Sequence, residues 1–276
     1  MIYAPVLYKL RKRNNVFVER NFKEGGEITV TKANKVKPYD SLGNGLQSGT
    51  SAKQSKKGFE LLSGVWGEVQ DVIEGNSVLL KTQVVDINLF LSTDISVAGE
   101  LLVFPNPSKQ LTQFYLDKFS KSNEGKIIYV GEYLDEILLD KAKQLKVSAL
   151  ICGSTSLQTY LIAKANKIAV GIITGFGELS TPAFVYDFLN TVSNRFVFFE
   201  GEKGFLRIPA EAPFTPKSIK PTPIKALKKG AAVQIFKEPN TGKIGIVDTV
   251  KQTSILVRVD EQEPFEVELP NLFILE

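Results

Sequence analysis

Glycine and hydroxyl residues gather at the ends of three predicted strands between residues 125 and 209. The strands are KIIYV, SALICG and IAVGIITGFG. The first is followed directly by Gly131, and the other two end at Gly153 and Gly177. The residues at the strand ends are Gly131, Gly153, Ser154, Thr155, Thr174, Gly175, Phe176 and Gly177. Backbone N–H groups at the start of a helix bind anions, and glycine lets a ligand approach the backbone. These eight residues form the candidate ligand-binding site, although ordinary turns between strands and helices have the same composition.

The composition excludes several kinds of catalytic site. The chain contains no histidine, so serine, cysteine and zinc sites that depend on an imidazole are excluded. Its one cysteine, Cys152, cannot form an internal disulfide and lies in an apolar segment typical of a buried strand end. Neither a dinucleotide fingerprint nor a Walker loop follows the first strand. Carboxylates, lysines, tyrosines, the one thiol or a bound cofactor remain as means of catalysis, and we predict no catalytic residue, no metal site and no cofactor.

Helical segments separate the three strands. Asp135 lies where the first helix would begin, residues 157–166 form the second, and Pro182 fits the first turn of the third. Ser154, Thr155 and Ser156 are the N-cap candidates of the second helix. Strands that alternate with helices of this length are typical of βαβ units. We therefore predict a mainly parallel sheet over residues 125–209, with the glycine-ended strands meeting at one edge.

Residues 24–108 consist of short strands separated by glycine turns, which predicts a compact all-β module. Within it, SGVWGEVQDVIEGNSVLL resembles the second half of the barrel-sandwich hybrid fold of lipoyl- and biotinyl-carrier domains. Carrier domains present a modified lysine within a fixed motif at a hairpin tip. Lys53, Lys56 and Lys57 lie in a predicted loop without that motif. The resemblance thus implies the fold and no prosthetic group.

Three further segments flank or connect these regions. Residues 1–23 are a basic N-terminal segment, interpreted as a solvated tail that docks through Val16 and Val18, or alternatively as a contact for phosphate or a membrane surface. Residues 109–121 are predicted to be a helix with a buried stripe, and residues 211–230 a Pro- and Lys-rich linker. The stripe consists of Leu111, Phe114, Tyr115 and Phe119.

The C-terminal residues 231–276 contain five predicted short strands. The segment VQIFKEPNTGKIGIV in particular resembles an SH3-like barrel of the KOW type, and such modules often bind RNA or protein. This region has four basic and eight acidic side chains, which opposes binding to phosphate. We expect an independent barrel that docks against the rest of the protein or against a partner.

A family resemblance covers roughly residues 24–210. GKIIYVGEYLDEILLDKAKQLKVSALICGS and IAVGIITGFGELSTPAFVYDFL are similar to segments of a family of uncharacterised bacterial and archaeal proteins with a lipoyl-like β region and a Rossmann-like domain. The distinctive motif is the Gly-Phe-Gly turn at Gly175, Phe176 and Gly177. The family has Thr-Glu before this turn, whereas this chain has Ile173 and Thr174. The resemblance implies a fold and no activity.

The predicted fold class is α/β plus all-β. A β-rich barrel-sandwich-like module at 24–108 precedes a Rossmann-like parallel α/β domain at 109–210 and an SH3-like barrel at 231–276. We interpret the chain as a non-enzymatic, multi-domain binding or assembly protein that acts through a protein partner or self-association. One alternative is a small-ligand-binding protein or enzyme with its site at the glycine-ended edge, and a second is a weak nucleic-acid-associated factor. With no apolar run of membrane-spanning length and no secretory signal pattern, a cytoplasmic location is expected.

The charge distribution makes a prediction about nucleic acids. The net charge is only +4, and the basic residues are concentrated in the N-terminal segment and the linker. Few phosphates can be neutralised in this way, so binding should be independent of sequence, with a Kd of roughly 10⁻⁴ to 10⁻⁶ M, and lost at physiological salt. Fluorescence anisotropy with labelled RNA over a salt series measures this, and tight binding that persists at high salt would contradict it.

Overall fold

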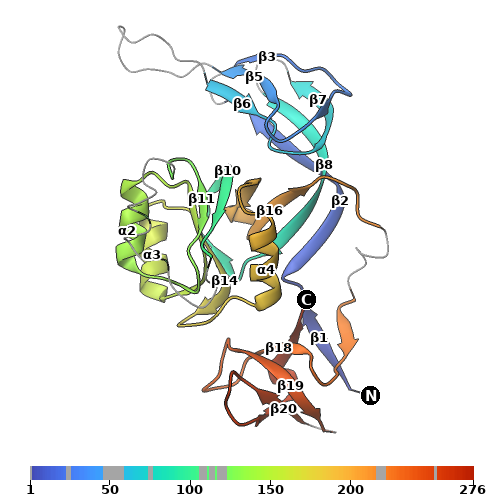
Figure 1. The fold of residues 1–276 in the computed structure, drawn as a ribbon, viewed down its shortest axis with the longest axis vertical. Coiled ribbons are helices and arrows are strands. Elements are labelled where there is room, and N and C mark those ends of the chain that lie inside the picture. Colours follow the sequence, from blue (N-terminus) through green and yellow to red (C-terminus); the bar gives the residue numbers. More distant parts are fainter. Residues whose placement is uncertain are drawn as a thin grey trace. The chain divides into compact units, whose positions relative to one another are not determined.

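A computed structural model of the chain describes residues 2–22, 26–45, 59–73, 77–105, 111, 116, 123–215, 222–251 and 254–276 (Figure 1). Strands make up most of the secondary structure of these residues, which is consistent with the predicted fold class of α/β plus all-β. Unit 1 comprises Met1–Arg11, Ile87–Leu206 and Lys220–Glu276, and unit 2 comprises Lys12–Asp86 and Arg207–Ile219. The loop lysines Lys53, Lys56 and Lys57 and the stripe residues Phe114, Tyr115 and Phe119 lie outside the described residues.

A mostly parallel sheet forms the centre of unit 1, with strand order β15-β10-β11-β13-β14-β9. The strands are β9 (Leu91–Ser92), β10 (Ser96–Val103), β11 (Ile127–Tyr129), β13 (Ala149–Thr155), β14 (Val170–Phe176) and β15 (Phe196–Glu200). β10, β11, β13 and β14 are parallel, whereas β15 and β9 pair antiparallel with β10 and β14. Ile127 pairs with Ala149 in the parallel sense, so the predicted parallel arrangement is confirmed.

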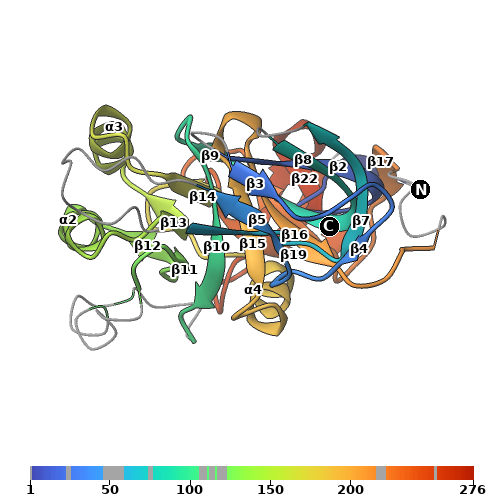
Figure 2. The same cartoon turned by 90° about the horizontal axis from the view of Figure 1, so that it is seen from above.

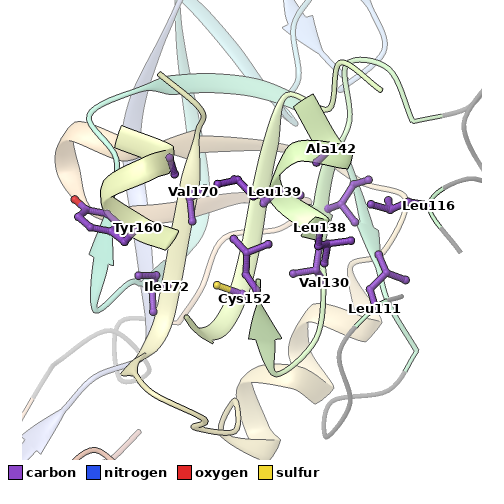
Figure 3. Packing of buried hydrophobic residues seen from close by; sticks show 14 residues of the cluster. Leu111, Leu116, Val130, Leu138, Leu139, Ala142, Cys152, Tyr160, Val170 and Ile172 are labelled. Atoms are coloured by element: carbon purple, nitrogen blue, oxygen red, sulfur yellow. The ribbon is translucent and has the colours of Figure 1, made fainter. Parts of the chain in front are cut away.

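The strands of this sheet are buried on both faces, which is usual for parallel sheets covered by helices. Helices α2 (Glu136–Gln144) and α3 (Leu157–Ala165) cover one face, and α4 (Ala183–Thr191) covers the other (Figures 1 and 2). Figure 3 shows the core beneath α2 and α3, where Leu138 and Tyr160 belong to the same apolar cluster as Cys152 of β13. On the opposite face, the ring of Tyr129 lies 6.0 Å from that of Tyr186 of α4.

Two helices begin with the predicted side-chain caps. Asp135 Oδ1 accepts a hydrogen bond from Leu138 N at 2.7 Å, and Ser156 Oγ accepts one from Thr159 N at 2.9 Å. Pro182 is the N-cap of α4 and makes no side-chain capping bond. The other two predicted caps of α3, Ser154 and Thr155, belong to β13 instead. β13 continues past its glycine because the short strand β12 (Tyr133–Leu134) pairs with its end.

A second sheet of unit 1 contains the C-terminal strands, in the order β17-β1-β22-β18-β19-β20-β21. Its elements are β1 (Tyr3–Leu7), β17 (Ile224–Ala226), β18 (Ala232–Ile235), β19 (Ile244–Val250), β20 (Ser254–Arg258), β21 (Phe265–Glu268), the 3-10 turn η4 (Leu269–Asn271) and β22 (Leu272–Leu275). β1 pairs with both β17 and β22, and Ala4 is fully buried in the same core as Val233 and Ile255. The sheet thus differs from the expected independent barrel of residues 231–276, because the N-terminus and the predicted linker each supply a strand.

Unit 2 contains two groups of antiparallel strands. One group has the order β4-β7-β8, with β2 and β16 also next to β8, and the other has the order β3-β5-β6. The strands are β2 (Leu10–Asn21), β3 (Gly26–Ile28), β4 (Lys35–Val36), β5 (Ser41–Gly45), β6 (Phe59–Leu62), β7 (Gly67–Ile73), β8 (Ser77–Asn88) and, after the 3-10 turn η2 (Gly201–Lys203), β16 (Phe205–Ala210). The basic N-terminal segment, interpreted as a solvated tail, instead forms two strands, β1 and the long β2, and Val16 and Val18 are buried as predicted.

A buried ion pair joins two of these strands. Asp86 of β8 accepts two hydrogen bonds from Arg207 of β16, with Nε at 2.9 Å from Oδ1 and Nη2 at 3.2 Å from Oδ2. Both side chains are almost completely buried. The half-exposed Arg13 reaches the same carboxylate, with Nη1 at 3.3 Å from Oδ2. A buried carboxylate is tolerated only when it is paired, so Arg207 keeps Asp86 compatible with the interior.

Substitution of Arg207 by methionine should destabilise unit 2 by about 3–5 kcal/mol, because Asp86 would lose its buried partner. The matched control is Arg13→Met, which removes the half-exposed partner of the same carboxylate and should cost about 1 kcal/mol or less. Urea unfolding followed by the fluorescence of Trp66, the single tryptophan of the chain and a unit 2 residue, measures both changes. Equal effects of the two substitutions would show that burial does not set the strength of this pair.

Candidate functional site

The predicted ligand-binding residues meet at the carboxyl edge of the parallel sheet. Gly153 N donates to Gly131 O at 2.9 Å, and Gly177 N donates to Thr155 O at 3.0 Å. Ser154 and Thr155 of β13 lie opposite Gly175 and Phe176 of β14. The structure therefore brings the glycine-ended strands together as predicted, and the question becomes whether a ligand could reach them.

Each hydroxyl of this edge bonds to the backbone of the chain itself. Ser154 Oγ donates to Glu132 O at 3.0 Å and accepts from Leu179 N at 3.0 Å. The other two hydroxyls donate in the same way, Thr155 Oγ1 to Leu134 O at 2.6 Å and Thr174 Oγ1 to Ser180 O at 2.9 Å. All three residues are at most 1% exposed. Their hydrogen-bonding capacity is directed inward and stabilises the loops that cover the strands.

Other parts of the chain fill the space next to Gly153 of β13. A Cβ added to Gly153 would lie 2.7 Å from Glu132 O and 2.8 Å from Thr181 Oγ1, closer than real contacts allow. The hydroxyl of Tyr129 lies 2.9 Å from Thr181 Oγ1 and holds this residue in place. Glycine is needed at position 153 because neighbouring parts of the chain occupy the volume a side chain would take.

Parts of the chain outside the α/β sheet complete the closure of this edge. Lys9 Nζ donates to Ile173 O at 2.7 Å, and Gln234 Nε2 of β18 donates to Thr174 O at 3.1 Å. The turn between β18 and β19 packs there as well, since a Cβ at Gly242 would lie 2.7 Å from Leu179 Cδ1. The C-terminal sheet thus covers the place where a ligand would approach the end of β14.

Burial also makes two titratable groups near this edge, Tyr129 and Cys152, unreactive. It raises the pKa of the Tyr129 hydroxyl and of the Cys152 thiol well above their ordinary values, so both stay protonated at neutral pH. Cys152 Sγ lies 3.7 Å from Gly171 O. A reactive cysteine needs a lowered pKa, and Cys152 has the opposite. Phe176 packs its ring against Phe90 and Tyr160, at centroid distances of 5.9 and 6.1 Å.

The described residues contain neither a cluster of metal-binding side chains nor a membrane-spanning helix. No three of their His, Cys, Asp and Glu side chains lie close enough together to hold a metal ion. None of the described helices has the length and apolar character needed to cross a bilayer.

Two surface features were not predicted from the sequence, and the first is the outer face of α3. Leu157 and Leu161 are 55% and 54% exposed, and with Ile162 and Ala165 they line a shallow hollow of about 620 Å³. Gln158 and Asn166 complete its lining. The sequence signal is that α3 has apolar residues on two faces, because Tyr160 and Ala163 already supply the buried face.

The second unpredicted feature is a cleft of about 570 Å³ in unit 2. Its floor is a face of the β4-β7-β8 sheet, and Trp66 is one of the residues that line it. The sequence signal is an alternation of period two, in which Lys35 and Lys37 flank the buried Val36, while Lys81 and Gln83 flank the buried Thr82. The sequence alone does not predict the pairing and register that place these strands next to one another.

Comparisons with known proteins supply no further constraint. A scan against protein-family models finds no match to the chain, and a search of curated proteins finds none either. The functional argument therefore depends on the residues and their geometry.

The buried Lys9 generates a pH prediction. Burial lowers the pKa of its ammonium group from 10.5 to about 8. The folded protein then holds fewer protons than the unfolded chain between about pH 8 and pH 10.5, so the contribution of Lys9 to stability rises with pH over this window. Below pH 8 the ammonium group is charged in both the folded and the unfolded protein, so the free-energy cost of burying it no longer changes with pH. Lys9→Met removes this dependence, and the stability of the variant relative to wild type should fall by about 3 kcal/mol between pH 7 and pH 10.5.

Chemical unfolding followed by far-UV circular dichroism at pH 7, 8, 9 and 10.5 measures this difference. The exposed Lys228 supplies the control, because Lys228→Met should give a difference that does not change with pH. A constant difference for Lys9→Met would mean that the amine is solvated in solution and that the sheet edge is open there.

Proposed function

We propose that this protein is a non-enzymatic, multi-domain binding or assembly protein that acts through contacts with another protein. The observation that carries the proposal is the exposed apolar face of α3, where Leu157 and Leu161 are more than half exposed one helical turn apart. Contiguous apolar surface is costly to leave in water, and it commonly marks a protein-binding site. A rigid helix on a packed core presents such a surface without a large loss of conformational entropy on binding.

The charges around this face favour one kind of partner. α3 has no acidic residue in its first turn, and Lys167 follows its last turn. Lys164 in the last turn is already paired with Asp94, with Nζ at 3.1 Å from Oδ2. Lys143 of α2 reaches the same end, with Nζ at 3.2 Å from Asn166 Oδ1. A complementary partner presents apolar side chains next to carboxylates, as an acidic amphipathic helix does.

The filled sheet edge argues against the main alternative, a small-ligand site or enzyme. The hydroxyls of Ser154, Thr155 and Thr174 are bonded to the backbone, and the volume next to Gly153 is occupied. A ligand would have to displace these bonds and the turn at Gly242. The second alternative, a nucleic-acid-associated factor, is disfavoured because the basic N-terminal residues belong to β2 and one of them, Arg13, is paired with Asp86.

Several finer assignments belong to the same proposal. The barrel-sandwich, Rossmann-like and SH3-like resemblances, and the family with the Gly-Phe-Gly turn, stay predictions from the sequence motifs. They are compatible with a binding role, since small β modules often serve in docking. The cytoplasmic location is likewise proposed from the sequence, in which a single cysteine cannot form an internal disulfide.

The test is binding of the full chain to an acidic amphipathic helical peptide, and to any partner then isolated from cells, by isothermal titration calorimetry. The double variant Leu157→Ser, Leu161→Ser should weaken binding by about a hundredfold, because each leucine contributes on the order of 1.5 kcal/mol when buried. The matched control is Ile246→Ser, which changes an apolar residue of β19 that is 48% exposed and should leave binding unchanged.

The double variant should keep the circular dichroism spectrum of the wild type, since both leucines point into solvent. Partner binding that survives the double variant would remove α3 from the site. Turnover or saturable binding of a small metabolite that is lost in Thr174→Val would instead support the enzyme or ligand-binding alternative.

A further inference from the structure

The floor of the unit 2 cleft is built from directly opposed side chains of three strands. Lys35 of β4 pairs with Glu68 of β7, and Glu68 pairs with Lys81 of β8. Residues directly opposite each other point to the same face of a sheet, and all three line the cleft. The floor therefore carries a row in which a carboxylate stands between two ammonium groups.

A second row lies two residues away from the first along the chain, just beyond the ends of β4 and β7 and within β8. Trp66, Lys37 and Gln83 have the same parity as the first row, and all three line the cleft. Val36 and Thr82, which alternate with them, are buried. An indole thus lies in the middle of the cleft between an ammonium group and an amide.

The position of Trp66 is fixed by its backbone. Its carbonyl oxygen accepts a hydrogen bond from Thr82 Oγ1 at 2.6 Å. The next residue is Gly67, where a Cβ would lie 2.4 Å from Lys81 O, so the strands approach each other closely at this point. The indole is half-buried and provides a flat apolar surface with one N–H donor at its edge. Pro213 adds a second apolar ring to the lining.

The charges that line the cleft balance. Lys35, Lys37 and Lys81 are opposed by Glu68, Asp40 and Glu211, and the amides of Asn15 and Gln83 add both donors and acceptors. Within the described part of the chain, none of the three lysines has a carboxylate within 4.0 Å. The lysine side chains are therefore available for hydrogen bonds to a bound molecule, whereas Asp40 Oδ2 already accepts a hydrogen bond from Lys37 N at 2.8 Å.

We propose that this cleft binds a short neutral oligosaccharide, with one sugar ring stacked on Trp66 and its hydroxyls bonded to the row of Lys35, Glu68 and Lys81. A sugar hydroxyl both donates and accepts, so it matches a wall in which donors and acceptors alternate. The C–H face of the ring packs on the indole. The cleft volume falls within the range of about 300–1,000 Å³ that small-ligand sites have.

The same features disfavour a nucleic acid as the occupant. Affinity for a phosphate backbone comes from an excess of positive charge, and here three carboxylates cancel the three lysines. Base stacking on Trp66 alone would not offset the repulsion of Glu68, Asp40 and Glu211. An anionic peptide meets the same repulsion.

Trp66 allows a direct test, because it is the single tryptophan of the chain and its fluorescence reports on the cleft alone. The full chain is titrated with neutral hexaoses of glucose, mannose, galactose and N-acetylglucosamine, in both α- and β-linked forms where they exist. A saturable change in emission with at least one hexaose is expected, and it should not depend on salt between low and high ionic strength. Single-stranded DNA and polyglutamate are titrated in parallel and should give no saturable change at physiological salt.

Variants then locate the site. Glu68→Gln and Lys81→Met should each weaken hexaose binding by about tenfold, the change expected when one hydrogen bond to a charged group is lost. Trp66→Ala, followed by calorimetry, should abolish it. The control is Glu60→Gln, which changes an exposed carboxylate of β6 that does not line the cleft and should leave the affinity unchanged. Thermal unfolding by circular dichroism establishes that each variant is folded.

Three results would overturn the proposal. The first is that none of the hexaoses changes the emission of Trp66. The second is that hexaose binding is unaffected by all three cleft substitutions. The third is that DNA or polyglutamate changes the emission with a higher affinity than every hexaose, which would assign the cleft to an anionic polymer.

Discussion

The hydroxyl of Ser154 bonds both to the bend between β11 and β12 and to the loop after β14. By donating to Glu132 O and accepting from Leu179 N, it closes the carboxyl edge of the parallel sheet. The rest of unit 1 is compatible with this closure: β12 pairs with the end of β13, Lys9 and Gln234 bond to the end of β14, and Gly242 packs against Leu179. A buried polar group that loses its hydrogen-bond partner destabilises the fold. Opening one of these contacts would therefore also weaken the others.

Because the edge is largely closed, the surfaces proposed to bind partners lie elsewhere. In an open α/β sheet the crevice at the carboxyl edge is the usual ligand site. Here neighbouring parts of the chain occupy it next to Gly153 and at the end of β14, whereas Gly177, beyond that end, is exposed. What unit 1 leaves exposed is the apolar face of α3, and what unit 2 leaves exposed is the mixed-charge cleft around Trp66. The two surfaces differ in chemistry, since one is apolar next to lysines and the other is polar around an indole. They are suited to different partners.

The sequence predicted those features that follow from local patterns. Glycine at the end of a strand, Asp135 and Ser156 before apolar helical spacing, and the alternation of strands with helices were sufficient for the parallel sheet and the caps of α2 and α3. It did not predict that β1 pairs with β22, because this pairing joins residues about 270 positions apart and neither strand specifies its partner. Glu68 between two lysines was missed for the same reason. Closure of the glycine-ended edge could not be predicted either, since the same glycines and hydroxyls occur in open sites.

Amide hydrogen exchange measured by NMR tests the closure of this edge most directly. The amides of Leu179 and Gly177 donate to Ser154 Oγ and Thr155 O and should exchange as slowly as that of Val130, which donates to Ile151 O within the sheet. Exchange of Leu179 and Gly177 as fast as that of the exposed turn residue Glu261 would contradict the closure. The edge would then open in solution, and a ligand could reach the glycine-ended strands.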